Sequence, residues 1–152
     1  MKKIKFILPL IFAVYFISFT GCSNQAKDGG LKWYDNLENA EQAAQKENKP
    51  IFVDFTGSDW CVWCKKLNSE VFTQDAFISY AKKNLILVKI DFPENIPQSA
   101  STKYYNQQLA QRFGVQGFPT VILLSSSGTT IAQTGYQPGG AENYVQYLKT
   151  VL

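Results

Sequence analysis

The sequence contains no histidine, a single arginine and only three cysteines, Cys22, Cys61 and Cys64. A zinc site needs about four ligands, usually cysteine or histidine, so one copy of this chain cannot build a four-cysteine or a mixed cysteine–histidine site. Attachment of c-type haem requires a histidine directly after the second cysteine of the pair, and Lys65 stands there. These absences exclude two common uses of closely spaced cysteines.

The chain also has little net charge outside its first 21 residues. Its formal charge is +3, from 15 basic and 12 acidic residues. Lys2, Lys3 and Lys5 precede residue 22, which leaves 12 basic against 12 acidic residues in the remainder. Nucleic-acid-binding domains usually carry a basic excess, so we expect no nucleic acid among the partners. A length of 152 residues with 45% hydrophobic content suits one globular domain.

Residues 1–22 have the three-part layout of a secretory signal. Three lysines form a positive start, and the apolar stretch that follows ends in Thr20-Gly21-Cys22. The segment resembles a bacterial lipoprotein signal, in which a cysteine after a small residue receives a lipid and becomes the new N-terminus. Phe19 departs from that pattern, which usually has leucine there.

The apolar core of this signal is about 14 residues long, shorter than the roughly 20 that a membrane-spanning helix needs. We therefore expect a signal peptide over 1–21, a lipid anchor on Cys22 at the periplasmic or extracytoplasmic face of a bacterial membrane, and a flexible tether over 22–30. An uncleaved anchor and ordinary cleavage nearby are the alternatives. Disulfides persist outside the cytoplasm, and lipidation of Cys22 would leave Cys61 and Cys64 as the only thiols.

Cys61 and Cys64 follow an apolar segment with strand character, 51–56, and stand at the start of a predicted helix. Residues three apart share a helix face with Cβ atoms about 5–6 Å apart. A disulfide needs about 3.5–4.5 Å, so a small adjustment joins the sulfurs. Unpaired N–H groups and the helix dipole favour a thiolate on the first cysteine. The spacing predicts a reversible dithiol/disulfide switch. A purely structural disulfide is the alternative, although it would close a very short loop and stabilise little.

Three segments together resemble thioredoxin-like proteins. Val53-Asp54-Phe55 with Trp60-Cys61-Val62-Trp63-Cys64-Lys65 is similar to the family's active-site segment, and Leu85 to Asp91 matches its middle strand. Gly114-Val115-Gln116-Gly117-Phe118-Pro119-Thr120-Val121 resembles its cis-proline segment. The resemblance covers the predicted domain, 31–152, in the order of the fold. It implies an α/β thioredoxin-like fold with a central mixed β-sheet flanked by helices, and the chain looks most like small exported reductases of the DsbH type.

The resemblance also implies roles for individual residues. Cys61 attacks a substrate disulfide, and Cys64 lies deeper and resolves the mixed disulfide. Asp54 lies beneath Cys64 and helps to move the proton of the Cys64 thiol, with the pKa of Asp54 raised by burial. An edge-facing or capping aspartate is the alternative for Asp54. Pro119 is expected in cis beside the cysteines, where the Phe118-Pro119 backbone holds an extended substrate. A trans proline that closes a loop is the alternative.

Trp60 and Trp63 offer an apolar surface for extended protein substrates, and we expect Trp63 to be the more exposed of the two. Packing against the fold is the alternative for both. Val62-Trp63, between the cysteines, lacks the histidine that stabilises the thiolate in strongly oxidising relatives. This absence favours a reductase or a mild exchanger.

The sequence departs from thioredoxin at two places near Asp54. The segment from Asp54 to Cys61 is one residue longer. Leu87 stands where thioredoxin has a lysine, four residues before the aspartate that ends its middle strand. Lys89 is placed on a different step of that strand, so the sequence does not predict the family's buried aspartate–lysine pair.

Apolar periodicity and cap residues predict the remaining elements. Asp35 or Asn36 caps the first helix, and Gly114 closes the fourth. The loop over 92–102 is longer than in thioredoxin and is a candidate to cover one side of the site. The expected strands are 31–34, 51–56, 85–91, one that ends at 124, and 129–134, and the expected helices are 36–47, 61–73, one from 73 or 75 to 83, 103–112 and 142–152.

We therefore predict an exported thiol–disulfide oxidoreductase that reduces protein disulfides, uses no metal or organic cofactor and receives electrons from a membrane-embedded thiol donor. One alternative is a disulfide oxidase or isomerase, and another is a lipid-anchored binding module whose disulfide is structural. A thiol peroxidase is disfavoured because its reactive cysteine usually works with a nearby arginine, and Arg112 is the chain's only one.

Overall fold

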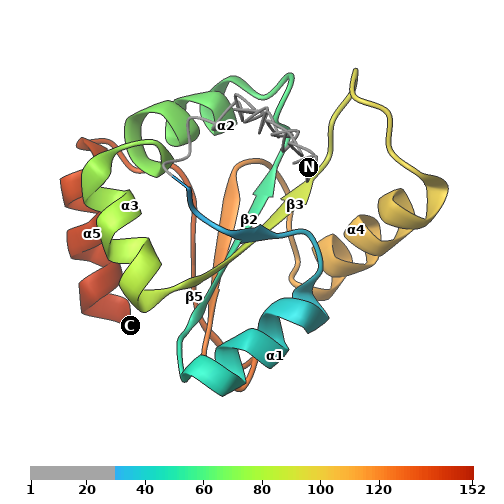
Figure 1. The fold of residues 1–152 in the computed structure, drawn as a ribbon. Coiled ribbons are helices and arrows are strands. Elements are labelled where there is room, and N and C mark those ends of the chain that lie inside the picture. The colour runs from blue at the N-terminus through green and yellow to red at the C-terminus, as the bar shows by residue number, and fades with distance from the viewer. Residues whose placement is uncertain (1–29) are drawn as a thin grey trace, which may run out of the picture.

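The computed structural model describes residues 30–152, which form a five-stranded mixed sheet with helices on both faces (Figure 1). The strand order is β1-β3-β2-β4-β5; β1, β3 and β2 are parallel, and β4 is antiparallel to both of its neighbours. This is the predicted fold class. In chain order the elements are β1 (Trp33–Tyr34), α1 (Leu37–Glu47), β2 (Ile51–Thr56), α2 (Val62–Leu67), the π-helical turn η1 (Asn68–Phe72), α3 (Asp75–Asn84), β3 (Ile86–Asp91), α4 (Ala100–Arg112), β4 (Thr120–Leu124), β5 (Thr130–Thr134) and α5 (Gly140–Val151).

The predicted signal peptide, the predicted lipidation site Cys22 and all of the predicted tether except Gly30 lie outside the described residues. Within residues 30–152, no helix combines the length and the apolar character needed to cross a membrane.

The central strand β2 is buried on both faces of the sheet, which is why its sequence is almost continuously apolar. Side chains alternate along a strand. Phe52 points into the core that α2, η1, α3 and α5 cover. Ile51, Val53 and Phe55 point into the core that α1 and α4 cover. Asp54, two residues after Phe52, therefore lies on the α2 face of the sheet.

Local polar contacts set the ends of the helices. The Asn36 side chain accepts a hydrogen bond from the Asn39 N–H at 2.8 Å and caps α1, as predicted. Ser99 caps α4 in the same way, with its Oγ accepting from the Thr102 N–H at 3.0 Å. The predicted start of this helix at 103 was therefore wrong by three residues, and the loop after β3 is shorter than expected.

The helix expected over 61–73 changes its winding partway. α2 ends at Leu67, and η1 continues with wider turns, in which the Thr73 N–H donates to the Asn68 carbonyl at 3.0 Å. Phe72, at the end of η1, packs edge-on against Phe52 of β2 with ring centroids 5.6 Å apart. The segment that carries the cysteines is thus anchored to the centre of the sheet.

Candidate active site

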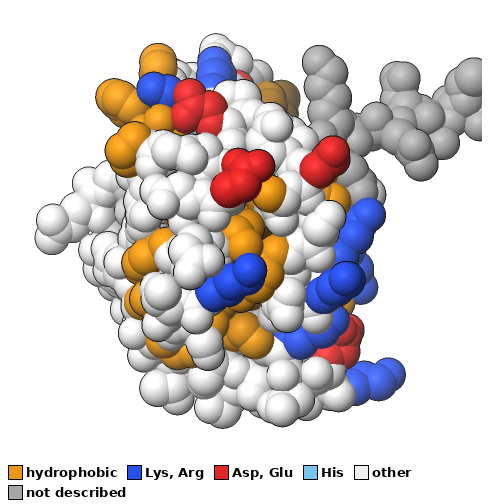
Figure 2. All heavy atoms as spheres, turned by 90° about the vertical axis from the view of Figure 1, so that its left-hand side faces the viewer, with side chains coloured by type: hydrophobic (Ala, Val, Ile, Leu, Met, Phe, Trp, Pro, Cys, Tyr) orange, Lys and Arg blue, Asp and Glu red, His pale blue; other side chains and the backbone are white. Residues whose placement is uncertain are grey.

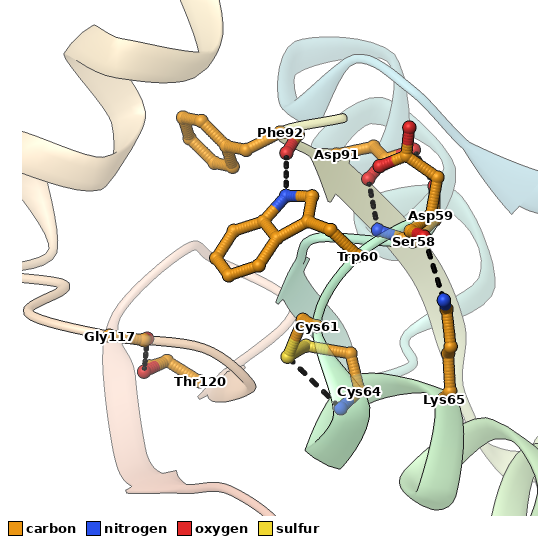
Figure 3. The surroundings of a disulfide bond; sticks show 10 residues. All are labelled: Ser58, Asp59, Trp60, Cys61, Cys64, Lys65, Asp91, Phe92, Gly117 and Thr120. Carbon is orange, nitrogen blue, oxygen red and sulfur yellow. Dashed lines mark hydrogen bonds between the residues drawn. A yellow bond between two sulfur atoms is a disulfide. The ribbon is translucent and has the colours of Figure 1, made fainter. Parts of the chain in front are cut away.

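Cys61 and Cys64 are joined by a disulfide at the N-terminal end of α2, with their Cα atoms 5.2 Å apart. Cys61 is the N-cap residue, and its Sγ accepts a hydrogen bond from the Cys64 backbone N–H at 3.1 Å (Figure 3). An N–H directed at Sγ, together with the positive end of the helix, stabilises negative charge there. The geometry therefore favours Cys61 as the thiolate once the disulfide is reduced.

The two cysteines differ in their surroundings more than in their exposure. Cys61 is 6% exposed and Cys64 is 5% exposed, so these values do not show the greater depth expected of Cys64. Cys64 instead lines a cavity of about 160 Å³ whose wall also includes Asp54 and Lys89. Cys61 does not line this cavity, and this distinguishes the two cysteines.

Asp54 is buried, and its Oδ1 has no hydrogen-bond partner among residues 30–152. Burial raises the pKa of Asp54 to about 7, while the charge of Lys89 lowers it and that of Asp91 raises it further. A carboxyl group with a pKa near neutrality can both accept and release a proton at pH 7. Because Asp54 and Cys64 line the same cavity, the arrangement suits proton exchange between them.

Lys89 lies directly opposite Asp54 in the register of β2 and β3. Lys89 stands two residues after the place of thioredoxin's lysine, as its position in the sequence indicates, but the register brings it opposite Asp54, and Leu87 is paired with Phe52 instead. Counting back from the end of a strand does not give its pairing, which is set by the neighbouring strand. The Lys89 ammonium lies over the Trp33 ring, 5.4 Å from the centroid, and Lys89 lines the same cavity as Asp54.

The Phe118–Pro119 peptide bond is cis, as the resemblance implied. Thr120 pairs with Phe55 across β4 and β2, so Pro119 lies at the edge of the sheet where β2 runs on toward the cysteines. The Thr120 hydroxyl donates to the Gly117 carbonyl at 2.7 Å (Figure 3). A Cβ on Gly135 would lie 2.8 Å from the Pro119 carbonyl oxygen, so this close approach requires glycine.

Trp60, Phe92 and Phe118 form an aromatic surface near the cysteines, here named the Trp60 wall. The Trp60 indole N–H donates to the Phe92 carbonyl at 2.8 Å (Figure 3). The Trp60 and Phe118 rings meet edge-on at 6.0 Å, and Phe92 and Phe118 stack at 4.9 Å. Gly57 leaves room for the indole, since a Cβ there would lie 2.5 Å from the ring. Trp60 remains 39% exposed, so it both packs against the fold and presents apolar surface.

Trp63, Tyr136 and Lys66 form a second group, here named the Trp63 cluster. The two rings lie 5.2 Å apart, and the Lys66 ammonium lies over both, at 5.2 Å from Trp63 and 5.1 Å from Tyr136. The Tyr136 hydroxyl donates to Glu70 at 2.7 Å. Trp63 is 54% exposed, which confirms that it is the more exposed tryptophan of the motif. Viewed from the α3–α5 side, one group of hydrophobic side chains lies at the upper left beside charged side chains, at the end where Figure 1 places α2, and further hydrophobic side chains show across the middle of this face (Figure 2).

Sequence reasoning missed two contributors to this region, Asp59 and Phe92. The Asp59 carboxylate binds backbone N–H groups of the loop after β3, and such groups leave no signature in the residue types. Phe92 gave a weak signal, because it is an aromatic residue at the start of a loop that was a candidate to cover the site. Its contact with Trp60, however, uses its carbonyl group, which every residue possesses.

Comparisons with known proteins agree with this geometry. Residues 37–152 match the family model of the thioredoxin-like domain. The disulfide bond reductase DsbH of Chlamydia pneumoniae is 35% identical over 122 residues, which cover 80% of this chain and 73% of DsbH. A solved structure of a DsbH oxidoreductase matches with a TM-score of 0.75 and 34% identity, over 80% of this chain and 84% of that one.

A longer relative matches over a shorter segment. The thiol:disulfide interchange protein DsbD of Campylobacter jejuni is 31% identical over 104 residues, which are 68% of this chain and 17% of DsbD. The family model spans Cys61, Cys64 and Pro119, the residues around which the site is built. The chain therefore belongs to the thioredoxin-like family and is a thiol–disulfide oxidoreductase.

Proposed function

We propose that this protein is an exported reductase of protein disulfides, held by a lipid on Cys22 at the extracytoplasmic face of a bacterial membrane. The main support is the disulfide between Cys61 and Cys64, which lies at the start of α2. The Pro119 segment and the Trp60 wall lie next to it. A redox-active pair beside a partly exposed apolar surface suits an extended polypeptide that carries a disulfide.

The reducing cycle begins with the dithiol form of the protein. The Cys61 thiolate attacks one sulfur of the substrate disulfide, so that a bond forms between Cys61 Sγ and that sulfur while the substrate S–S bond breaks. The second substrate sulfur leaves as a thiolate and takes a proton from water. The backbone at Phe118-Pro119 holds the substrate segment in an extended conformation through main-chain hydrogen bonds.

The second step releases the substrate. The Asp54 carboxylate accepts the proton of the Cys64 thiol, and the resulting thiolate attacks Cys61 Sγ. The bond between Cys61 and the substrate breaks, and the substrate sulfur leaves as a thiolate. The protein is left with the disulfide between Cys61 and Cys64. Two electrons have then passed from protein to substrate, and an external dithiol must return them.

The residues between the cysteines support this direction of electron flow. Val62 and Trp63 bring no charge to the Cys61 thiolate, whereas a histidinium there would stabilise it and raise the reduction potential. The similarity to DsbH, named a disulfide bond reductase, supports the same direction. The similarity to a segment of DsbD, named a thiol:disulfide interchange protein, supports a membrane-embedded thiol relay as the electron donor.

The proposal is tested by trapping the mixed disulfide. With dithiothreitol as donor, the wild-type protein is expected to reduce insulin catalytically. Without a donor, the prereduced Cys64→Ser variant should accumulate a covalent adduct with insulin, because the resolving thiol is missing. Cys61→Ser is the matched control and should form no such adduct, since it lacks the nucleophile.

Two results together would overturn the reductase proposal. One is a Cys61 thiol that does not react with alkylating agents after reduction. The other is a Cys64→Ser variant that traps no disulfide-bearing protein. The disulfide would then be structural, and the molecule a binding module.

A further inference from the structure

The loop that joins β3 to α4 is fixed to the active-site segment by a carboxylate two residues before Cys61. Asp59 accepts hydrogen bonds from three successive backbone N–H groups, those of Glu94 at 3.0 Å, Asn95 at 2.6 Å and Ile96 at 3.2 Å. Desolvation raises the pKa of Asp59, but the bonds from this backbone outweigh it and hold the pKa below its ordinary value. At neutral pH the carboxylate is therefore charged, the form that binds N–H groups most strongly.

A second carboxylate fixes the start of the same loop. The Ser58 N–H and hydroxyl donate to Asp91, the last residue of β3, at 2.9 Å and 2.6 Å. Together, Asp91 and Asp59 join two segments that are more than 30 residues apart in the chain. We name the bonds of Asp59 to Glu94, Asn95 and Ile96 the loop clamp.

The clamped loop begins at a member of the Trp60 wall. Phe92 stands two residues before the clamp, accepts the Trp60 indole N–H and stacks on Phe118. Ile96, at the other end of the clamp, is an exposed hydrophobic side chain on the same loop. The Phe92 N–H also donates to the Thr56 carbonyl at 2.8 Å, which holds the backbone of Phe92 against β2. The clamp adds a second attachment at Asp59, the residue directly before Trp60, so the position of this apolar surface relative to the cysteines depends on both contacts.

We propose that Asp59 is a positioning residue that sets substrate specificity, because its loop clamp keeps the Trp60 wall in place to receive an apolar side chain next to the disulfide of a polypeptide substrate. This inference deepens the proposed reductase function and rests on it. A small disulfide such as oxidised glutathione needs the cysteines but brings no such side chain. The clamp therefore favours polypeptide disulfides over small ones.

The test compares both substrate types in the full-length protein. Asp59→Ala should raise the KM for a peptide disulfide with a phenylalanine beside its cysteine by about tenfold, the effect of losing hydrogen bonds to a charged group. The kcat for this peptide and the rate with oxidised glutathione should change less than about twofold. Water can reach the three N–H groups at the surface, so the variant should keep its fold while hydrogen exchange at residues 94–96 becomes faster.

Two further variants separate positioning from structure. Asp59→Asn keeps an oxygen acceptor without the charge and should restore part of the lost affinity. Glu94→Ala removes a carboxylate from the same loop but keeps the backbone N–H that the clamp uses, and it should match the wild type.

An equal loss with both substrates, or an unchanged KM for the peptide despite faster exchange at residues 94–96, would overturn the inference. Failure of the wild-type protein to reduce either substrate would instead refute the proposed function itself, and the inference with it. The failure of each proposal is thus recognised by a different result.

Discussion

The surface beside the disulfide and the cavity under Cys64 are built from different kinds of group. At the surface, the Trp60 wall and the Trp63 cluster present aromatic rings whose polar atoms are bonded, as in the contact of Trp60 with the Phe92 carbonyl. In the cavity, Asp54 and Lys89 bring titratable groups, and Asp54 Oδ1 has no bonding partner within residues 30–152.

This contrast implies that the surface binds the substrate and that the cavity serves proton transfer. The rings offer contact area to a polypeptide but no proton acceptor. The cavity, at about 160 Å³, offers a proton acceptor but is too small for a peptide. Substitutions at the surface should therefore change KM, and substitutions in the cavity should change kcat and its pH dependence.

The largest expected effect is the loss of folding stability that follows when the buried Asp54 ionises. Burial raises the pKa of Asp54 from 3.8 to about 7, so the native state keeps a proton that the unfolded chain releases above about pH 4. The contribution of Asp54 to the stability of the native state is fully present below that pH and is lost as the pH rises through the native-state pKa of about 7. The loss amounts to about 4 kcal/mol by pH 8.

Urea unfolding of the oxidised protein at several pH values measures this loss. Asp54→Asn cannot ionise, so its stability advantage over the wild type should grow from pH 4 to pH 8. A difference between the two proteins that does not depend on pH would contradict the assignment of a buried, ionising Asp54.

The next effect is kinetic and concerns the release of substrate. Asp54→Asn removes the proton acceptor of Cys64 and should slow the resolution of the mixed disulfide by about 100-fold at pH 7. In the wild type this rate should rise as the pH increases through about 7, because the ionised form of Asp54 is the base. Quenched-flow measurement of the mixed disulfide gives the rate directly.

Asn68→Ala is a control for this measurement, since Asn68 also lines the cavity but has no titratable group. Its rate should keep the wild-type dependence on pH. A raised KM with an unchanged kcat in Asp54→Asn would place Asp54 in substrate binding and contradict the proposed separation of substrate binding from proton transfer.

The surface predicts a smaller effect that differs between the two tryptophans. Trp60→Ala should raise the KM for a polypeptide disulfide by about tenfold, because it removes contact area and leaves the Phe92 carbonyl without its donor. Trp63→Ala should raise it by about threefold, since Trp63 is more exposed and its loss leaves the bond between Tyr136 and Glu70 in place. Steady-state kinetics of both variants tests this order, and equal effects would show that the two aromatic groups do not differ in binding.

The smallest effect is a shift along the pH axis. The Lys89 charge lowers the pKa of Asp54, so Lys89→Met should raise that pKa and move the midpoint of the pH–rate curve to higher pH. The effect is measured on the same quenched-flow signal. An unchanged midpoint would mean that Lys89 does not act on Asp54.

Sequence patterns predicted the parts of this site that depend on side chains at fixed positions. The apolar segment 51–56, the spacing of Cys61 and Cys64, and the Phe118-Pro119 pair each have a recognisable order of residue types, and the structure places them as the family resemblance implied. Asp54 was identified from its place in the segment that resembles the family's active site.

The parts that were missed depend on backbone groups and on pairing between distant segments. Lys89 faces Asp54 because of the register of β3 against β2, which neither strand specifies alone. The loop clamp joins Asp59 to N–H groups more than 30 residues away, and any residue type except proline could supply them. Contacts of this kind are recognised only in the three-dimensional structure.

The reduction potential of the Cys61–Cys64 couple, measured by equilibration with glutathione, tests the central claim most directly. A value near about −270 mV, like that of thioredoxin, is the result expected of a reductase whose thiolate receives no help from a histidine. A value near about −120 mV, like that of the strong oxidant DsbA, would contradict the claim and make the protein a donor of disulfides.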